Sequence, residues 1–198
     1  MLNKLRNQLE PLINWLAHMV ASIGLSPNQL SILGFMLSIA AGIVYSLSSR
    51  TALNNPYVTV QLAGIFLLIA GFFDVLDGAV ARLTNKTSKR GAYLDSILDK
   101  VAEIFVLISI YLGGLSSAIW CLVALGLALL VSYTRARAEA LSVPLIGVGI
   151  GERAERLLIL ALISMIPVAG AMQIAVIIVS IVSGITIIQR MNTVIRQL

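Results

Sequence analysis

Long apolar stretches alternate with short polar segments along the chain. Four of these stretches carry no charged residue, and they cover residues 30–47, 58–73, 104–113 and 119–131. With its flanking residues, each stretch reaches the roughly 20 residues that a helix needs to cross a bilayer. The pattern therefore predicts an all-α integral membrane protein that folds as a single domain over residues 1–198.

Residues 1–24 have the pattern of an amphipathic helix. The apolar positions follow the i, i+3, i+4 and i+7 spacing of one helix face and are Leu2, Leu5, Leu9, Leu12, Ile13 and Leu16. Charged and amide side chains occupy the opposite face. Such a helix lies in the membrane interface, a depth that suits Trp15.

Residues 27–195 are predicted to form a bundle of six transmembrane helices. Ser26, Pro27 and Gln29 give a helix start in which Ser26 caps the first turn and Gln29 closes a capping box. Proline and glycine residues separate the later spans. The predicted spans are 27–48, 58–82, 92–112, 116–138, 153–166 and 171–195.

Basic residues gather in alternate connections of this bundle. They flank the N-terminal segment, the connections between spans two and three and between spans four and five, and the C-terminus, whereas the opposite connections contain only Arg50. Because cytoplasmic loops carry the excess of lysine and arginine, we expect both termini on the cytoplasmic side of the cell membrane.

Composition agrees with this assignment and narrows the classes of partner. The chain is 59% hydrophobic and 12% charged, with a mean hydropathy of +0.97, whereas a soluble domain carries about 25% charged residues. The net charge is +5. We expect the basic residues to bind anionic head groups and substrate phosphates, not nucleic acid. Cys121 is the only cysteine, so the chain forms no internal disulfide.

All four aspartates of the chain fall between positions 74 and 99. Asp74 and Asp77 are three residues apart near the end of the second span, and Asp95 and Asp99 are four apart at the start of the third. Each pair therefore shares one face of its helix. The short connection makes the two helices antiparallel neighbours, which brings both pairs to the cytoplasmic end.

Carboxylates at this depth are costly unless a cation neutralises them. An all-oxygen ligand set favours Mg²⁺ or Mn²⁺ over zinc, and two ions would suit phosphoryl chemistry. Two alternatives remain open at this point. The aspartates could form inert ion pairs with bases such as Arg82 and Lys100, or they could form the cation site of a transporter.

The spacing of this segment resembles a known family signature. The residues from Asp74 to Asp99 match D-x₂-D-G-x₂-A-R-x₈-G-x₃-D-x₃-D at every fixed position, which is the signature of the CDP-alcohol phosphotransferase family. The resemblance implies a six-span enzyme with an interfacial helix, usually a homodimer, which joins a CDP-linked alcohol to a second alcohol and releases CMP.

The resemblance also implies roles for individual residues. Two Mg²⁺ ions, for which Mn²⁺ can substitute, would be held by Asp74, Asp77, Asp95 and Asp99, with Asp99 as general base on the attacking hydroxyl. The residues that would bind the CDP-lipid donor are Asn28, Asp77, Gly78, Ala81, Arg82, Ser88 and Gly91. Glu103 continues the face of Asp95 and Asp99 and is a candidate partner of the site.

A second set of charged residues indicates the acceptor. Four arginines end the fourth span and begin the fifth, on the side of the aspartates: Arg135, Arg137, Arg153 and Arg156. Arginine favours phosphate, so we expect an acceptor that carries its own phosphate. The surrounding Tyr-x-Arg-Ala-Arg-Ala-Glu and Glu-Arg-x-Glu-Arg patterns resemble the inositol phosphate branch of the family, the phosphatidylinositol and archaetidylinositol phosphate synthases. That resemblance adds Arg190 to the acceptor set and favours the archaeal form.

The leading hypothesis is thus a phospholipid-synthesising transferase with CDP-archaeol or CDP-diacylglycerol as donor and inositol phosphate as acceptor. Glycerol 3-phosphate is the alternative acceptor. A cation-binding transporter is the alternative of a different class, but it would place charged residues at mid-membrane depth in several spans, whereas here they gather at one end.

Overall fold

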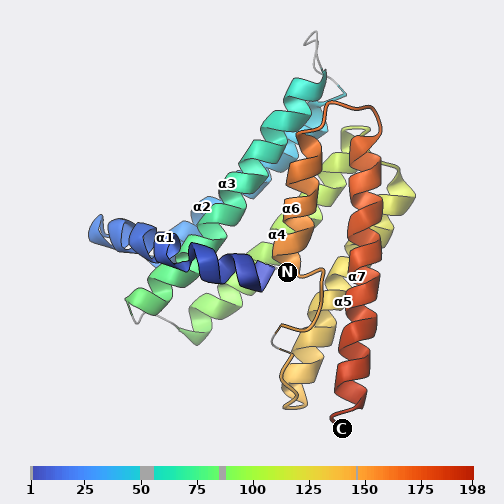
Figure 1. The fold of residues 1–198 in the computed structure, drawn as a ribbon. Helices are drawn as coiled ribbons and strands as arrows, with labels where there is room; N and C mark the ends of the chain where they lie inside the picture. The colour runs from blue at the N-terminus through green and yellow to red at the C-terminus, as the bar shows by residue number, and fades with distance from the viewer. Residues whose placement is uncertain (1, 50–55, 85–87, 146) are drawn as a thin grey trace.

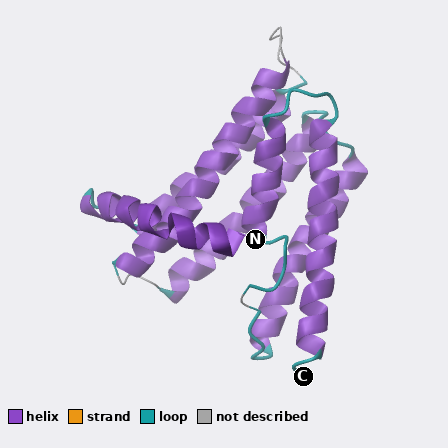
Figure 2. Ribbon diagram, viewed as in Figure 1, coloured by secondary structure: helices purple, strands orange, loops and turns teal. Residues whose placement is uncertain are grey.

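The computed structural model describes residues 2–49, 56–84, 88–145 and 147–198 and, among these, all regular secondary structure is helical (Figure 2). Arg50 lies outside the described residues. The helices are α1 (Leu2–Ser22), α2 (Pro27–Leu47), α3 (Pro56–Leu83), α4 (Lys89–Leu112), α5 (Ala118–Ala140), α6 (Arg153–Ser164) and α7 (Ala171–Ile195).

Helix α1 crosses the bundle that the other six helices form (Figure 1). The side chains of Ile13, Leu16 and Val20 on α1 pack on a small buried cluster that contains Leu30 of α2 and Leu76 of α3. The amphipathic prediction for this segment therefore agrees with a helix that covers the bundle with its apolar face.

The helix start predicted at Ser26 is confirmed. The Ser26 Oγ accepts a hydrogen bond from the Gln29 backbone N–H, and the Gln29 side chain accepts one from the Ser26 N–H at 2.8 Å. This reciprocal capping box satisfies two backbone donors that a helix terminus otherwise leaves free. It fixes the entry into α2 close to Asn28, which belongs to the predicted donor site.

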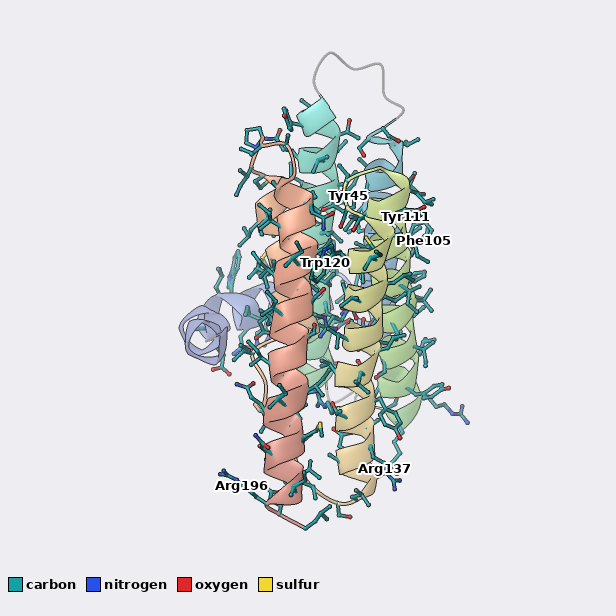
Figure 3. The ribbon with its side chains drawn as sticks, turned by 90° about the vertical axis from the view of Figure 1, so that its right-hand side faces the viewer. Tyr45, Phe105, Tyr111, Trp120, Arg137 and Arg196 are labelled. Atoms are coloured by element: carbon teal, nitrogen blue, oxygen red, sulfur yellow. The ribbon has the colours of Figure 1, made fainter. Side chains whose placement is uncertain are left out.

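The connections between α4 and α5 and between α6 and α7 lie at one end of the bundle, and the connection between α5 and α6 and the C-terminus lie at the other (Figure 1). The side chains of Arg137 and Arg196 mark this second end, whereas Tyr45 and Tyr111 lie nearer the first (Figure 3). The basic connection between α5 and α6 therefore shares an end of the bundle with the C-terminus.

Four of the described helices are long and apolar enough to cross a membrane: α2, α3, α5 and α7. By length and hydropathy, the structure therefore supports four of the six predicted spans. Helix α4 has sufficient length but carries the charges of the predicted site. Helix α6 has 12 residues and a length of about 18 Å, short of the roughly 30 Å hydrocarbon core.

Close helix packing positions the aspartates. Gly34 of α2 lies against α3, where a Cβ atom would come 3.3 Å from the Ala70 carbonyl oxygen and 3.9 Å from the Asp74 nitrogen. Small residues allow such approach of helix backbones. A larger residue at position 34 would push α3, and with it Asp74, away from α2.

Candidate active site

The four aspartates line one pocket, as their spacing predicted. Ser31 and Gly34 of α2 and Arg153 of α6 contribute to the same pocket. Helices α2, α3, α4 and α6 therefore meet at the carboxylates.

Three of the carboxylates form the closest group. Asp74, Asp95 and Asp99 each offer an oxygen, and these oxygens lie within 4.8 Å of one another. Hard divalent cations such as Mg²⁺ and Mn²⁺ take oxygen ligands at about 2.0–2.6 Å, so one ion can reach all three with small side-chain adjustments. The donor set fits the metal that the sequence predicted.

Asp77 lies in the same pocket but is held differently. The Ser31 Oγ donates a hydrogen bond of 2.6 Å to the Asp77 Oδ2, and the Asp77 side chain is buried. Such a bond fixes the orientation of the carboxylate before any ligand arrives. Ser31 was missed at the level of sequence because it lies 46 residues away from Asp77.

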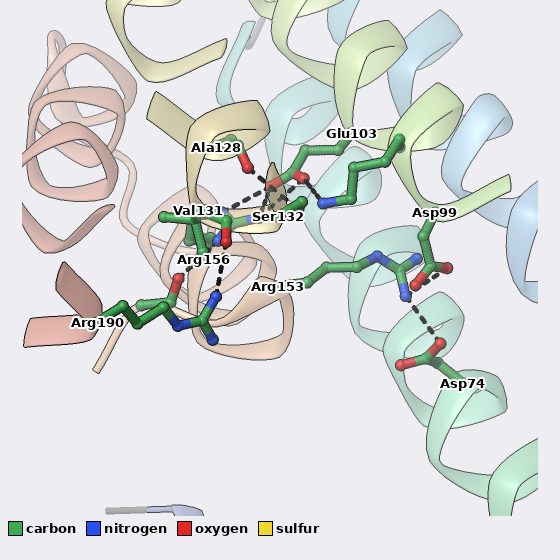
Figure 4. Close-up of polar contacts among 11 residues, drawn as sticks. Asp74, Asp99, Glu103, Ala128, Val131, Ser132, Arg153, Arg156 and Arg190 are labelled. Atoms are coloured by element: carbon green, nitrogen blue, oxygen red, sulfur yellow. Dashed lines mark hydrogen bonds and ion pairs between the residues drawn. The ribbon is translucent and has the colours of Figure 1, made fainter. Parts of the chain in front are cut away.

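Arg153, predicted to bind the acceptor phosphate, lies directly against the carboxylates (Figure 4). Its Nη1 is 2.8 Å from the Asp74 Oδ1 and 2.7 Å from the Asp99 Oδ1. Arg153 is the first residue of α6, so the start of this helix places a guanidinium next to the aspartates.

Arg156 and Glu103 form a buried ion pair behind this contact (Figure 4). The Arg156 Nε donates to the Glu103 Oε1 at 2.7 Å and Nη2 donates to Oε2 at 2.9 Å. Lys100 adds a third bond to Glu103 at 2.7 Å, and Arg156 Nη1 donates to the Gly151 carbonyl at 2.6 Å. Glu103, a candidate partner by its helix face, thus partners the second arginine of α6.

Arg190 of α7 holds the connection between α5 and α6. It donates to the carbonyl oxygens of Val148 at 2.9 Å and Val131 at 2.7 Å, and it pairs with Glu152 at 2.9 Å. Arg190 is buried. Glu152 received no role from the sequence, although its position directly before Arg153 was visible.

The glycine-rich part of this connection packs on α7. The Gly151 N–H donates to the Thr186 Oγ1 at 2.8 Å. Gly149 has φ +125°, and a Cβ at this residue would lie 2.5 Å from the Thr186 Cγ2. Only glycine fits this conformation and this space without strain. The loop that precedes α6 is therefore held against α7.

Arg135 and Arg137, the remaining members of the predicted acceptor set, are exposed near the end of α5. Arg135 forms an ion pair with Glu139 at 2.9 Å and lies within electrostatic range of Arg190.

The predicted donor residues form a second group beside the aspartates. Ser88 caps α4 by accepting a bond from the Gly91 N–H at 3.0 Å. A Cβ at Gly91 would lie 3.1 Å from the Ser88 Oγ and 3.2 Å from the Asn28 Oδ1, so the starts of α2 and α4 meet here. Gly78 and Arg82 lie one turn apart on α3, with the Arg82 Nη1 3.4 Å from a Cβ placed at Gly78. Ala81 lies on the same turn.

A family model and individual known relatives both match this chain over most of its length. The family model described as CDP-alcohol phosphatidyltransferase matches residues 24–188. The chain is 38% identical over 192 residues to the archaetidylinositol phosphate synthase of Pyrococcus horikoshii, covering 96% of this chain and 94% of that one. It is 35% identical to the phosphatidylinositol phosphate synthase of Streptomyces avermitilis, covering 88% and 74% of the two chains.

Solved structures agree in fold. The phosphatidylinositol phosphate synthase of Mycobacterium tuberculosis with CDP-DAG bound superposes with a TM-score of 0.73 at 25% identity, covering 93% of this chain and 94% of that chain. The structure of that enzyme with manganese and citrate gives a TM-score of 0.73 at 26% identity, over 92% and 88% of the two chains.

Proposed function

Because this chain belongs to the CDP-alcohol phosphatidyltransferase family, we propose that it transfers the phosphatidyl-type group of a CDP-linked lipid to inositol phosphate and releases CMP. The observation that carries the proposal is the meeting of the carboxylate group Asp74, Asp95 and Asp99 with Arg153. A metal-binding half for the pyrophosphate and a cationic half for a second phosphate thus lie side by side.

The relatives support this choice of substrates. Those with high coverage include archaetidylinositol phosphate synthases, and a structural neighbour holds CDP-DAG. The archaeal relatives favour CDP-archaeol as the donor, with CDP-diacylglycerol as the alternative lipid. Glycerol 3-phosphate remains the alternative acceptor, because its phosphate would use the same arginines.

The proposed metal site consists of Asp74, Asp77, Asp95 and Asp99 and holds two Mg²⁺ ions. Mn²⁺ is the proposed substitute, supported by the neighbouring structure that contains manganese. When bound, the ions neutralise the pyrophosphate oxygens and stabilise the departing CMP. The bond from Ser31 to Asp77 keeps one carboxylate oriented for this purpose.

On the donor side, Asn28, Ser88 and Gly91 lie close together where the starts of α2 and α4 meet, and the nucleotide would bind beside them. Gly78 and Ala81 allow the nucleotide to approach the α3 backbone, and Arg82 balances phosphate charge. Asp99 accepts the proton of the attacking hydroxyl, because it belongs to the carboxylate group and also contacts Arg153, the arginine assigned to the acceptor.

On the acceptor side, Arg153 contacts the inositol phosphate, and the exposed side chains of Arg135 and Arg137 complete the anion site. Arg156 and Arg190 contribute positive charge from buried positions. They also donate hydrogen bonds to the Gly151 and Val148 carbonyls and so hold the loop that leads into α6. The positive charge on several arginines favours a phosphorylated polyol over a neutral alcohol or serine.

We further propose that α4 and α6 cross the membrane with the other four helices, which gives six spans with both termini and the site on the cytoplasmic side. In this arrangement α1 lies in the interface and the protein works as a homodimer in the cell membrane. The basic connection between α5 and α6 shares its end of the bundle with the C-terminus, and an excess of basic residues is typical of the cytoplasmic side.

An acceptor panel tests the proposal. Detergent-solubilised protein with Mg²⁺ and a CDP-lipid should release CMP with inositol phosphate, less with glycerol 3-phosphate, and none above background with inositol or serine. Equal turnover with unphosphorylated inositol would contradict the role of the arginines.

A further inference from the structure

Arg153 contacts the oxygens that a metal would need. Its Nη1 lies 2.8 Å from the Asp74 Oδ1 and 2.7 Å from the Asp99 Oδ1, and both carboxylates belong to the group that can hold an ion. We propose that Arg153 couples the two halves of the site: it pairs with the metal carboxylates, yields them to the incoming cation, and turns to the acceptor phosphate. This inference rests on the proposed function.

The two arginines at the start of α6 differ in a way that supports this role. Arg156 is 1% exposed and has fixed partners at Nε, Nη1 and Nη2 in Glu103 and the Gly151 carbonyl. Arg153 is 17% exposed and uses a single nitrogen for two carboxylates. Its buried Nε has no hydrogen-bond partner among the described residues.

A buried donor without a hydrogen-bond partner is destabilising, because it has lost its bond to water and gained none in return. The Arg153 Nε therefore lacks a partner in this position, whereas each of the three guanidinium nitrogens of Arg156 has one. An anion that accepted bonds from both Nε and Nη of Arg153, as a phosphate does in a bidentate contact, would satisfy the donor that the carboxylates leave without a partner.

Repulsion between the cation and the Arg153 guanidinium drives this exchange of partners. A divalent ion between Asp74 and Asp99 would lie within a few ångströms of the guanidinium, and like charges at such distances repel strongly in a half-buried site. The backbone of α6 stays in place because the Arg156–Glu103 pair anchors it. Only the Arg153 side chain has to move, and it already lines the pocket of the four aspartates.

This exchange predicts a thermodynamic linkage. If the metal releases Arg153 for the acceptor, each ligand tightens the binding of the other by the same factor. Mn²⁺ is the probe, and its affinity for the solubilised full-length protein is measured by electron paramagnetic resonance with and without inositol phosphate, in the absence of CDP-lipid. We expect inositol phosphate to tighten Mn²⁺ binding roughly tenfold, within the usual range of such couplings.

The variant Arg153→Gln separates this exchange from simple attraction between bound ions. It should bind Mn²⁺ roughly tenfold more tightly than the wild type without acceptor, and most of the coupling should vanish. Arg196→Gln removes one positive charge at the exposed C-terminus and should match the wild type. Coupling that persists unchanged in Arg153→Gln, or Mn²⁺ binding that does not tighten, would overturn the inference.

Wild-type protein alone also decides the matter if the variant fails to fold. A wild type that releases CMP with inositol phosphate but shows no coupling between Mn²⁺ and acceptor overturns the exchange and leaves the proposed function intact. A wild type that releases no CMP with any phosphorylated acceptor overturns the proposed function itself.

Discussion

Arg156 donates two hydrogen bonds to Glu103, and this ion pair lies one helical turn behind the contact between Arg153 and Asp99. Arg156 follows Arg153 by three residues on α6, and Glu103 follows Asp99 by four on α4. Helices α4 and α6 are thus joined by two ion pairs. The buried pair Arg156–Glu103 fixes how the helices pack, and the partly exposed pair Arg153–Asp99 lines the pocket.

Replacing Glu103 tests the anchoring role of this pair. Glu103→Gln leaves the buried guanidinium of Arg156 without a counter-charge, and breaking such a pair costs about 3–5 kcal/mol. We expect a large fall in the thermal unfolding midpoint of the solubilised protein. Glu139→Gln, which removes an exposed pair with Arg135, is the matched control and should cost less than about 1 kcal/mol. Similar midpoints for the two variants would refute the anchor.

Removing the hydroxyl of Ser31 tests the orientation of Asp77. Ser31→Ala deletes the 2.6 Å bond and lets the carboxylate turn, so Mn²⁺ should bind roughly tenfold more weakly, as is usual when a partner of a metal ligand is lost. Ser46→Ala, near the other end of α2 where the hydroxyl donates to the Ile43 carbonyl at 2.7 Å, serves as the control. Unchanged Mn²⁺ affinity in Ser31→Ala would argue against this role.

Gly149→Ala tests the loop that joins α5 to α6. The added Cβ meets Thr186 at a backbone angle of φ +125°, a conformation that costs a non-glycine residue about 1–3 kcal/mol. We expect the loop to shift and the KM for inositol phosphate to rise severalfold, with little change in the KM for the CDP-lipid. Gly126→Ala in α5, where nothing lies within 4 Å, should leave both constants unchanged. A rise in the donor KM alone would contradict the assignment of this loop to the acceptor.

Asp99→Asn tests the proposed base. The variant loses proton-accepting ability and a metal ligand together, so kcat should fall by at least about 100-fold. Glu10→Gln, on the exposed face of α1, removes an acid outside the site and should retain full activity. Full activity in Asp99→Asn would remove this residue from the mechanism.

Local patterns predicted most of the architecture. The bounds of α7 and the start of α2 agree with the sequence to the residue, because a capping box and a proline-glycine break are local signals. The aspartate pocket was also predictable, since i, i+3 and i, i+4 spacing on two antiparallel neighbours leaves little freedom.

Partners distant in sequence were not predictable in the same way. The bonds from Ser31 to Asp77 and from Arg156 to Glu103 join residues 46 and 53 positions apart, and no periodicity encodes which side chains meet across a bundle. The sequence placed Arg153 and Arg156 in one acceptor set. Packing separates them, because Arg153 at the first turn of α6 reaches the aspartates whereas Arg156 one turn later is enclosed against α4.

The most direct measurement of the central claim is the identity of the product. Solubilised protein is incubated with Mg²⁺, a CDP-lipid and inositol phosphate, and the lipids and nucleotides are quantified by mass spectrometry. We predict a phospholipid that carries the inositol phosphate head group and CMP in equal amounts, both lost when the metal is chelated. CMP without the new lipid, or a product that persists after chelation, would contradict the account.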